Sequence, residues 1–346
     1  MTCCIPTGSI FLSSLRKAAA MKYYLGIDVG GTKTHALIAD EHGTARGFGA
    51  AGPGNHEGVG YDGLAAAMQT SLQAAVAQAH ISPAEIAGAG FGIAGYDFPS
   101  ERQPTLEAIA TLGLDCPVEA VNDVVIGLIA GASHGWGVVV DAGTGCNVRG
   151  RTADGREGWV TGCGSLFGEY GGAGDIVFRA VQAVSHHWSR RGPATALSEA
   201  LMRKVGASTL TDLIEGLALQ KYHLHGEYAR LVFEVASSGD AVAQEVIRWV
   251  ATELGETTKA VIRQIDIQNQ PFEVVLIGSV FNGGPLFTRP LQETILSFAP
   301  GATFTRLSTP PVVGGVLLGM EVAGLCTDEL RSHLIESTHA YQALWR

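Results

Sequence analysis

The sequence predicts an α/β protein made of two related halves, each with a mixed sheet whose faces are covered by helices. Near the N-terminus an apolar stretch runs into a Gly30-Gly31 turn and an alternating apolar pattern follows, which is typical of a β-meander. Strand-like and helix-like segments then alternate, which favours parallel pairing and covered faces. A second carboxylate and glycine-rich tip at Asp141–Asn147 repeats the chemistry of the first tip and indicates a duplicated fold.

The composition favours an enzyme of small-molecule chemistry. The 346 residues are 46% hydrophobic and include 46 glycines, which suits two domains of ordinary size with many tight turns. The formal net charge of -10 argues against nucleic acid as a partner, because such partners need clustered lysine and arginine. No apolar run approaches the roughly 18 residues that cross a membrane. We therefore expect a cytoplasmic protein without a membrane segment.

The six cysteines, Cys3, Cys4, Cys116, Cys146, Cys163 and Cys326, contain no CxxC pair, so we expect reduced thiols. Residues 1–20 imitate a signal peptide, but their positive charges follow the apolar part instead of preceding it. Met21 stands directly before the first strand. We therefore interpret 1–20 as a misassigned translation start or an extension, outside the fold.

The first half begins with three strands, expected at Tyr23–Val29, Thr34–Ala39 and Thr44–Ala50. Apolar residues at helical spacing predict a helix over 63–80. The remaining elements expected in this half are a strand over Ile86–Ile93, a helix over Pro104–Leu112 and a strand over Val118–Val121.

The second half repeats this beginning. Strands are expected at Gly137–Asp141, Val148–Arg151 and Gly158–Val160, and a glycine-rich loop over Gly162–Gly172 follows. The expected helices are 173–188, 195–204, 209–219, 227–237, 240–265, 286–298, 312–323 and a closing amphipathic helix over 327–344, with further strands at 272–277 and 303–307.

The first tip has the residues that hold phosphate. Gly30 and Gly31 permit positive φ and let backbone N–H groups approach an anion. Thr32 adds a hydroxyl donor, Lys33 adds a positive charge, and Asp28 at the strand end suits a magnesium ion held through water. The stretch is not a Walker A loop, because threonine stands where glycine must precede the lysine. Taken alone, it is equally compatible with an ordinary tight hairpin.

Three segments in order resemble one superfamily: Asp28–Thr34 after the first strand, Asp141–Asn147 after a later strand, and a strand entering the glycine turn over 278–284. They resemble the sugar kinase, Hsp70 and actin superfamily. Within it, residues 22–323 are similar to the N-acetylglucosamine kinases and the BadF/BadG/BcrA/BcrD-type ATPases. The resemblance implies two ribonuclease-H-like (actin-like ATPase) domains, 21–123 and 124–323, with a cleft between them. The C-terminal segment 324–346 is expected to pack back on the first domain.

The resemblance also implies ATP and Mg²⁺ as cofactors. Asp28 would orient the magnesium ion. The residues implied to surround ATP lie in the two tips and the later glycine turn: Gly30, Gly31, Thr32, Lys33, Gly143, Thr144, Gly145, Gly278 and Ser279. Opposed glycine tips supply the positioning and charge neutralisation that phosphoryl transfer requires.

The resemblance further implies that Asp123 is the general base that accepts the proton of the attacking hydroxyl. The alternative for Asp123 is that it caps the helix beginning near Val124. Asn55, Asn147 and Glu169, together with Asp123, would contact a sugar, although Asn55 also suits a plain turn.

The acceptor is expected to be an amino sugar, with N-acetylglucosamine phosphorylated on its 6-hydroxyl favoured. Glucosamine or another hexose stays open, because two positions depart from the family pattern. Kinases of this family commonly have the motif Gly-Asp-Glu-Gly, and this chain has Gly168-Glu169-Tyr170-Gly171 at that place. They commonly have serine at the position of Cys146. A homodimer is expected from the resemblance alone.

Three other functions compete with this interpretation. A BadF-type ATPase that activates a reductase or dehydratase would need an iron–sulfur cluster, for which Cys116 and Cys163 are candidates. A sugar-kinase-like repressor would need an N-terminal DNA-binding helix pair, and residues 1–20 are too short for one. The Gly162–Gly168 glycines resemble a dinucleotide-binding loop only weakly, because no clear ribose-binding acid follows.

Overall fold

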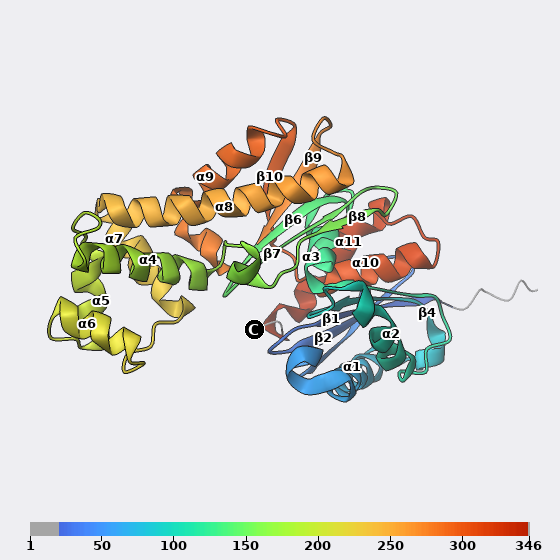
Figure 1. Ribbon diagram of the computed structural model, residues 1–346. Coiled ribbons are helices and arrows are strands. Elements are labelled where there is room, and N and C mark those ends of the chain that lie inside the picture. Colours follow the sequence, from blue (N-terminus) through green and yellow to red (C-terminus); the bar gives the residue numbers. More distant parts are fainter. Residues whose placement is uncertain (1–20, 345–346) are drawn as a thin grey trace, which may run out of the picture.

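The computed structural model describes residues 21–344, so Cys3, Cys4 and the expected extension at 1–20 lie outside the described residues. Two five-stranded sheets form the framework (Figure 1). The first sheet has the order β3-β2-β1-β4-β5, and its strands are Ala45–Ala51, Thr34–Asp40, Tyr23–Val29, Ile86–Ile93 and Val118–Asn122. The second has the order β10-β9-β6-β7-β8, and its strands are Ala302–Arg306, Phe272–Ile277, Gly137–Ala142, Cys146–Arg151 and Glu157–Trp159.

The two sheets share one topology. In the first sheet β1 is central, antiparallel to β2 and parallel to β4. In the second sheet β6 is central, antiparallel to β7 and parallel to β9. This match confirms the expected α/β class and its duplication. It also places the ends of β1 and β6, which carry Asp28 and Asp141, at equivalent points of the two halves.

Helices cover both sheets. Their bounds are α1 His56–Ala79, α2 Arg102–Ala110, α3 Asp123–Gly131, α4 Ala173–Trp188, α5 Leu197–Val205, α6 Leu210–Ala218, α7 Ala229–Ser237, α8 Ala241–Ile265, α9 Pro285–Leu296, α10 Val312–Val322 and α11 Asp328–Ser337. Helices α4 to α7 extend away from the first sheet on one side of the molecule (Figure 1). Short 3₁₀ turns connect several elements, among them Gly164–Phe167 and Ser279–Gly283.

Glycines let α10 lie directly on the first sheet. A Cβ added to Gly26 of β1 would lie 2.3 Å from the Val316 backbone nitrogen, and one added to Gly90 of β4 would lie 2.2 Å from the Gly315 carbonyl oxygen. Helix α10 follows the second sheet in the chain but packs on the first, and it also contacts α3. This backbone-to-backbone packing fixes β1, the strand that carries Asp28 near its end.

Two helix boundaries differ from expectation. The closing helix is shorter, because α11 ends at Ser337 and a 3₁₀ segment over Thr338–Leu344 follows. The first helix starts earlier, at His56, with a break at Gly60, whose φ is 70°. The Ser337 hydroxyl accepts a hydrogen bond from the Ala45 N–H at 2.9 Å, which ties α11 to β3. The division of the chain at residues 123 and 124 stays a prediction.

Candidate active site

Three carboxylates meet where the two halves join. Asp28 lies near the end of β1, Asp141 lies near the end of β6, and Asp123 begins α3. Burial raises the pKa of Asp28 to about 7, although the charge of Lys33 lowers it in part. Burial also raises the pKa of Asp141 to about 6. The pKa of Asp123 rises to about 8, through burial first and then through the charges of Asp28, Asp141 and Asp97.

This cluster of acids suits a hard cation. Like-charged carboxylates disfavour each other's ionised form, and a divalent cation between them would reverse that effect. Within residues 21–344 no three His, Cys, Asp or Glu side chains are close enough to hold a metal directly. Carboxylate oxygens are ligands that a magnesium ion accepts while it keeps part of its water, so Asp28, Asp123 and Asp141 are the residues that could hold one.

The first tip is exposed and has room for an anion. Its turn is closed by a bond from the Gly30 N–H to the Lys33 carbonyl at 2.9 Å, and Gly31, Thr32 and Lys33 are exposed. Gly30 and Gly31 have no positive φ, so this turn does not use the conformational freedom that glycine permits. A Cβ on Gly31 would meet no atom of the described chain within 4 Å. The packing of the chain therefore does not require glycine at position 31. A phosphate that approaches the backbone N–H groups would require it, because a side chain would stand in its way.

The loop before α1 packs against this tip. The Gly54 N–H donates to the Gly30 carbonyl at 3.1 Å. A Cβ on Gly54 would lie 2.6 Å from Val29 Cγ1 and 2.8 Å from Thr34 Oγ1. Gly54 is thus required by packing, in contrast to Gly31.

The second tip rests on the start of α4. The Gly143 N–H donates to the Gly145 carbonyl at 2.9 Å, and the Ala173 N–H donates to the Gly143 carbonyl at 2.9 Å. The Gly174 N–H donates to the Thr144 carbonyl at 3.0 Å. Added Cβ atoms on Gly143 and Gly145 would meet no atom of the described chain within 4 Å. The second tip is therefore as open as the first.

The third glycine turn lies against the second tip. Gly278 has a φ of 100°, and a Cβ there would lie 2.3 Å from the Ala142 carbonyl oxygen. A cavity of about 420 Å³ adjoins this turn and is lined by Ser279, Asn282, Phe233 and, at the start of α4, Ala173. The cavity therefore reaches from the turn to the helix on which the second tip rests.

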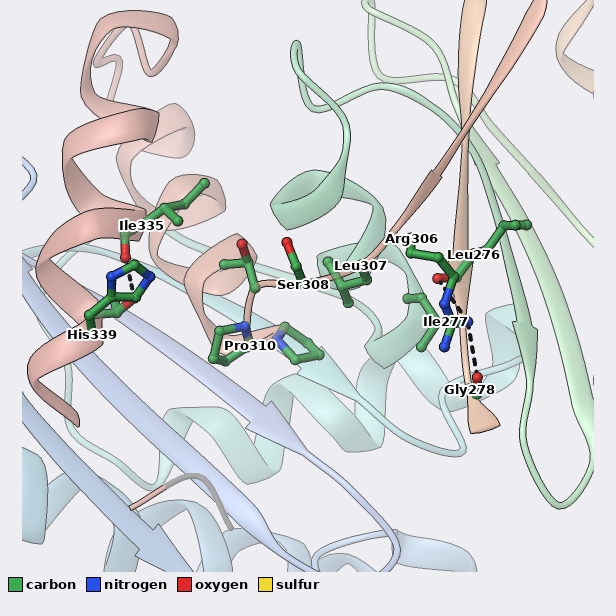
Figure 2. A pocket seen from close by; sticks show the side chains of 12 residues that line it. Leu276, Ile277, Gly278, Arg306, Leu307, Ser308, Pro310, Ile335 and His339 are labelled. Atoms are coloured by element: carbon green, nitrogen blue, oxygen red, sulfur yellow. Dashed lines mark hydrogen bonds between the residues drawn. The ribbon is translucent and has the colours of Figure 1, made fainter. Parts of the chain in front are cut away.

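On another side the same turn borders a cavity of about 560 Å³ (Figure 2). Arg306 at the end of β10 donates to the Gly278 carbonyl at 3.0 Å and to Asn282 Oδ1 at 3.3 Å. Ile335 and His339 line the opposite wall of this cavity. Arg306 thus holds the turn in place from outside.

Asp123 is not the helix cap. Asn122 takes that position, and its Oδ1 accepts a hydrogen bond from the Val124 N–H at 3.1 Å. The same N–H also donates to Asp123 Oδ1 at 3.0 Å. The Asp123 carboxylate therefore sits in the first turn of α3, half-buried beside Asp28 and Asp141.

The expected sugar residues lie on three different segments. Asn55 caps α1 by accepting from the Glu57 N–H at 2.9 Å, and a Cβ on Gly95 would lie 2.5 Å from Asn55 Oδ1. Asn55 therefore has a structural role at the start of α1, and its side chain lies beside Gly95, in the turn that follows β4. Asn147 pairs with Asp141 across β6 and β7. The Asn147 Oδ1 atom is buried and has no hydrogen-bond partner among the described residues.

Glu169 is buried in the glycine-rich loop. Its Oε1 accepts from the Thr161 N–H at 2.8 Å and its Oε2 accepts from the Thr161 hydroxyl at 3.0 Å. Glu169 therefore holds the two ends of this loop together, and any bond to a sugar would use the remaining lone pairs.

Sequence reasoning missed three charged residues of the site. The sequence places Asp141 in the second tip without indicating a role for it, although its position mirrors that of Asp28. Asp97 follows β4, and Arg149 lies on β7 two residues after Asn147 on the same face. The Arg149 guanidinium donates to Asp97 Oδ1. No local pattern marks Asp97 or Arg149, because their pairing depends on two sheets meeting.

Comparisons with known proteins find similar chains among the sugar kinases. The curated N-acetylmuramic acid/N-acetylglucosamine kinase of Clostridium acetobutylicum is 28% identical over 76% of this chain and 86% of its own length. The N-acetyl-D-glucosamine kinase of Dictyostelium discoideum is 24% identical over 86% of this chain and 97% of its own length.

Solved structures show the same actin-like ATPase fold. A structure from Chromobacterium violaceum, provisionally called an N-acetylglucosamine kinase, has a TM-score of 0.61 at 23% identity and covers 86% of this chain and 99% of its own. A ROK family glucokinase from Streptomyces griseus, solved with glucose and AMPPNP, has a TM-score of 0.52 at 19% identity and covers 87% and 99%. The model of the BadF/BadG/BcrA/BcrD ATPase family matches residues 25–319, and the chain belongs to that family.

Proposed function

We propose that this protein transfers the terminal phosphoryl group of ATP to an amino sugar, with the 6-hydroxyl of N-acetylglucosamine as the acceptor. The observation that carries the proposal is the meeting of Asp28, Asp123 and Asp141 beside two open glycine tips. The names of the two curated relatives support the amino sugar as acceptor class.

The nucleotide would lie along the second half. Its phosphates would accept hydrogen bonds from backbone N–H groups of Thr144 and Gly145 in the second tip and of Gly31 and Thr32 in the first tip, because the chain leaves open space beside Gly145 and Gly31. The adenosine would occupy the cavity of about 420 Å³ lined by Ser279 and Asn282, because that cavity begins at the helix supporting the second tip.

Asp28 and Asp141 fit a magnesium ion held through water, and the bound ion would neutralise charge on the transferred phosphoryl group. With a cation bound, the Asp123 carboxylate would be ionised and ready to accept a proton.

The transfer then needs one proton step from this chain. The acceptor hydroxyl oxygen attacks the terminal phosphorus, the bond from phosphorus to the bridging oxygen breaks, and ADP leaves with that electron pair. Asp123 takes the hydroxyl proton, which a carboxylate in this position can do. Asn55 and Asn147 would orient the sugar, and the unpartnered Asn147 oxygen is a ready acceptor for a sugar hydroxyl.

A panel of hexoses and N-acetylhexosamines with ATP and Mg²⁺ tests the proposal, with both ADP and phosphosugar measured. We expect N-acetylglucosamine 6-phosphate from the wild type and a 10²- to 10⁴-fold lower kcat from Asp123→Asn. Asp154→Asn, at an exposed turn after β7, is the control and should keep full activity. Full activity in Asp123→Asn would eliminate this residue as the base, and a wild type inactive on every sugar would refute the kinase.

The same panel separates the kinase from an ATPase that activates a reductase. Iron bound after anaerobic purification, with ADP released without any phosphosugar, would favour the ATPase. Cys163 is exposed on the glycine-rich loop, whereas Cys116 packs beside the core of the first half. A homodimer stays a prediction from the family resemblance.

A further inference from the structure

One buried ion pair joins the two sheets beside the proposed base. Asp97 lies on the turn after β4, in the first sheet, and Arg149 lies on β7, in the second sheet. The Arg149 Nη2 atom donates to Asp97 Oδ1. Arg149 is only 4% exposed, and its buried charge is compensated by the bond to Asp97 and by the nearby Glu157 carboxylate.

An aromatic contact joins the same two segments as this ion pair. Phe98, next to Asp97, meets Trp159 of β8 edge to face, with ring centroids 5.9 Å apart. The Arg149 guanidinium lies 5.6 Å from the centre of the Trp159 ring. The contact between Phe98 and Trp159 therefore joins the turn after β4 to the edge of the second sheet, and the contact within the second sheet places the Arg149 guanidinium beside the same ring.

The pair also reaches the proposed base through the helix cap. The Asn122 Nδ2 atom donates to Asp97 Oδ1 at 3.1 Å and to the Tyr96 carbonyl at 3.3 Å. Asn122 in turn caps α3, whose first residue is Asp123. On the other side, Arg149 and Asn147 lie on the same face of β7. Asp97 thus connects the base of one half with a sugar residue of the other.

The surroundings of the pair make it important for alignment. A cavity of about 520 Å³ lies beside it, lined from both halves by residues that include Glu119, Asn122, Arg151 and Trp159. The sheets are therefore not packed directly together at this edge, and specific side-chain contacts hold them. A loss of the pair would change the relative position of Asp123 and Asn147 more than it would change either sheet.

We infer that Asp97 and Arg149 are positioning residues, which hold the two halves together at the acceptor side so that Asp123 faces the acceptor hydroxyl. This inference rests on the proposed kinase function. In this inference the pair aligns the acceptor with the base and does not contact ATP. Poor alignment lets water compete as the phosphoryl acceptor, so the pair also limits wasteful ATP hydrolysis.

A double-mutant cycle tests the inference with Asp97→Asn, Arg149→Met and the double variant, assayed well below each melting temperature. We expect each single change to lower kcat for phosphosugar about 10- to 100-fold, with the KM for ATP kept within about 3-fold. We also expect a higher ratio of free phosphate to phosphosugar. The kcat of the double variant should lie within about 3-fold of the kcat of the less active single variant, because both changes break the same contact.

Arg151→Met is the matched control. Arg151 lies on the same strand and forms an ion pair with Glu321 at 3.0 Å, but it has no bond to the segment that carries the base. It should lose thermal stability without a change in kcat or in the ratio of phosphate to phosphosugar. Arg149→Lys, which keeps the charge, should recover part of the lost kcat and serves if Arg149→Met does not fold.

Three results overturn the inference. Multiplicative effects of the two single changes would show independent roles, and variants that melt earlier but keep wild-type kcat would show a purely structural role. A wild type that phosphorylates no sugar would refute the proposed function and this inference with it. That outcome is distinct, because it is seen before any variant is made.

Discussion

Because the glycine tips are open, we expect that a substitution there weakens phosphate binding without lowering the stability of the fold. Gly31→Ala adds a methyl group where the described chain has no atom within 4 Å, at a residue without positive φ. Folding should be unaffected or favoured by about 0.4 to 1 kcal/mol, because alanine lowers the entropy of the unfolded chain. The methyl group would instead occupy the space through which a phosphate oxygen reaches the backbone N–H groups.

The size of the binding effect follows from the bonds at risk. A hydrogen bond to a charged group contributes about 1.5 to 3 kcal/mol, and about 1.4 kcal/mol corresponds to a tenfold change in affinity. Loss of one such bond should therefore lower kcat/KM for ATP roughly 10- to 100-fold. The assay is steady-state ADP release at varied ATP, together with thermal unfolding of the same protein sample.

Gly54→Ala is the opposite control on the neighbouring loop. Its added Cβ would lie 2.6 Å from Val29 Cγ1, and such overpacking costs about 1 to 3 kcal/mol. This variant should melt earlier than the wild type. If Gly31→Ala kept the wild-type kcat/KM for ATP, or lost as much stability as Gly54→Ala, the assignment of the first tip to phosphate binding would be refuted.

Three further predictions concern the acids, the loop and the nucleotide turn. Without Mg²⁺, stability should fall as the pH rises from about 5 to 8, because Asp28, Asp123 and Asp141 have folded pKa values of about 7, 8 and 6 and their unfolded values are near 3.9. The folded state then binds more protons than the unfolded state throughout this range. Melting curves against pH should show the fall, Asp123→Asn should flatten it, and a rise would contradict it. Glu169→Gln should raise the KM for the sugar roughly 10-fold and leave the KM for ATP unchanged, since one charged acceptor is lost; equal changes in both constants would argue against a sugar role. Arg306→Met should raise the KM for ATP about 3- to 10-fold through loss of the bonds that hold the nucleotide turn, and an unchanged KM would show that this turn needs no support.

Local chemistry made much of the site predictable. The tips at Gly30 and Gly143 combine a strand end, a carboxylate and glycines within a few residues, so the sequence alone indicates their geometry. Gly31, Gly143 and Gly145 have no positive φ, so open space beside the backbone, and not an unusual backbone conformation, accounts for glycine at these positions. The sequence did not decide which residue of the pair Asn122-Asp123 caps α3, because both residue types suit that position. In the structure Asn122 is the cap.

The residues that sequence reasoning missed depend on distant parts of the chain. Asp97 and Arg149 meet only because the turn after β4 reaches the edge of the second sheet. The buried bonds of Glu169 to Thr161 depend likewise on how the glycine-rich loop closes. A carboxylate in a loop has no pattern that distinguishes an ion pair from a solvent-exposed position, so neither contact could be inferred beforehand.

The duplicated topology also explains why only one base is expected. Both halves place a carboxylate at the end of their central strand, Asp28 on β1 and Asp141 on β6. Only the first half follows its fifth strand directly with a helix that begins with an acid, Asp123. In the second half β10 leads instead into the loop 307–311, which contains no acidic residue. Two equivalent tips suit the two sides of one polyphosphate, and the acid that breaks the symmetry is the reason for proposing that the acceptor binds beside the first half.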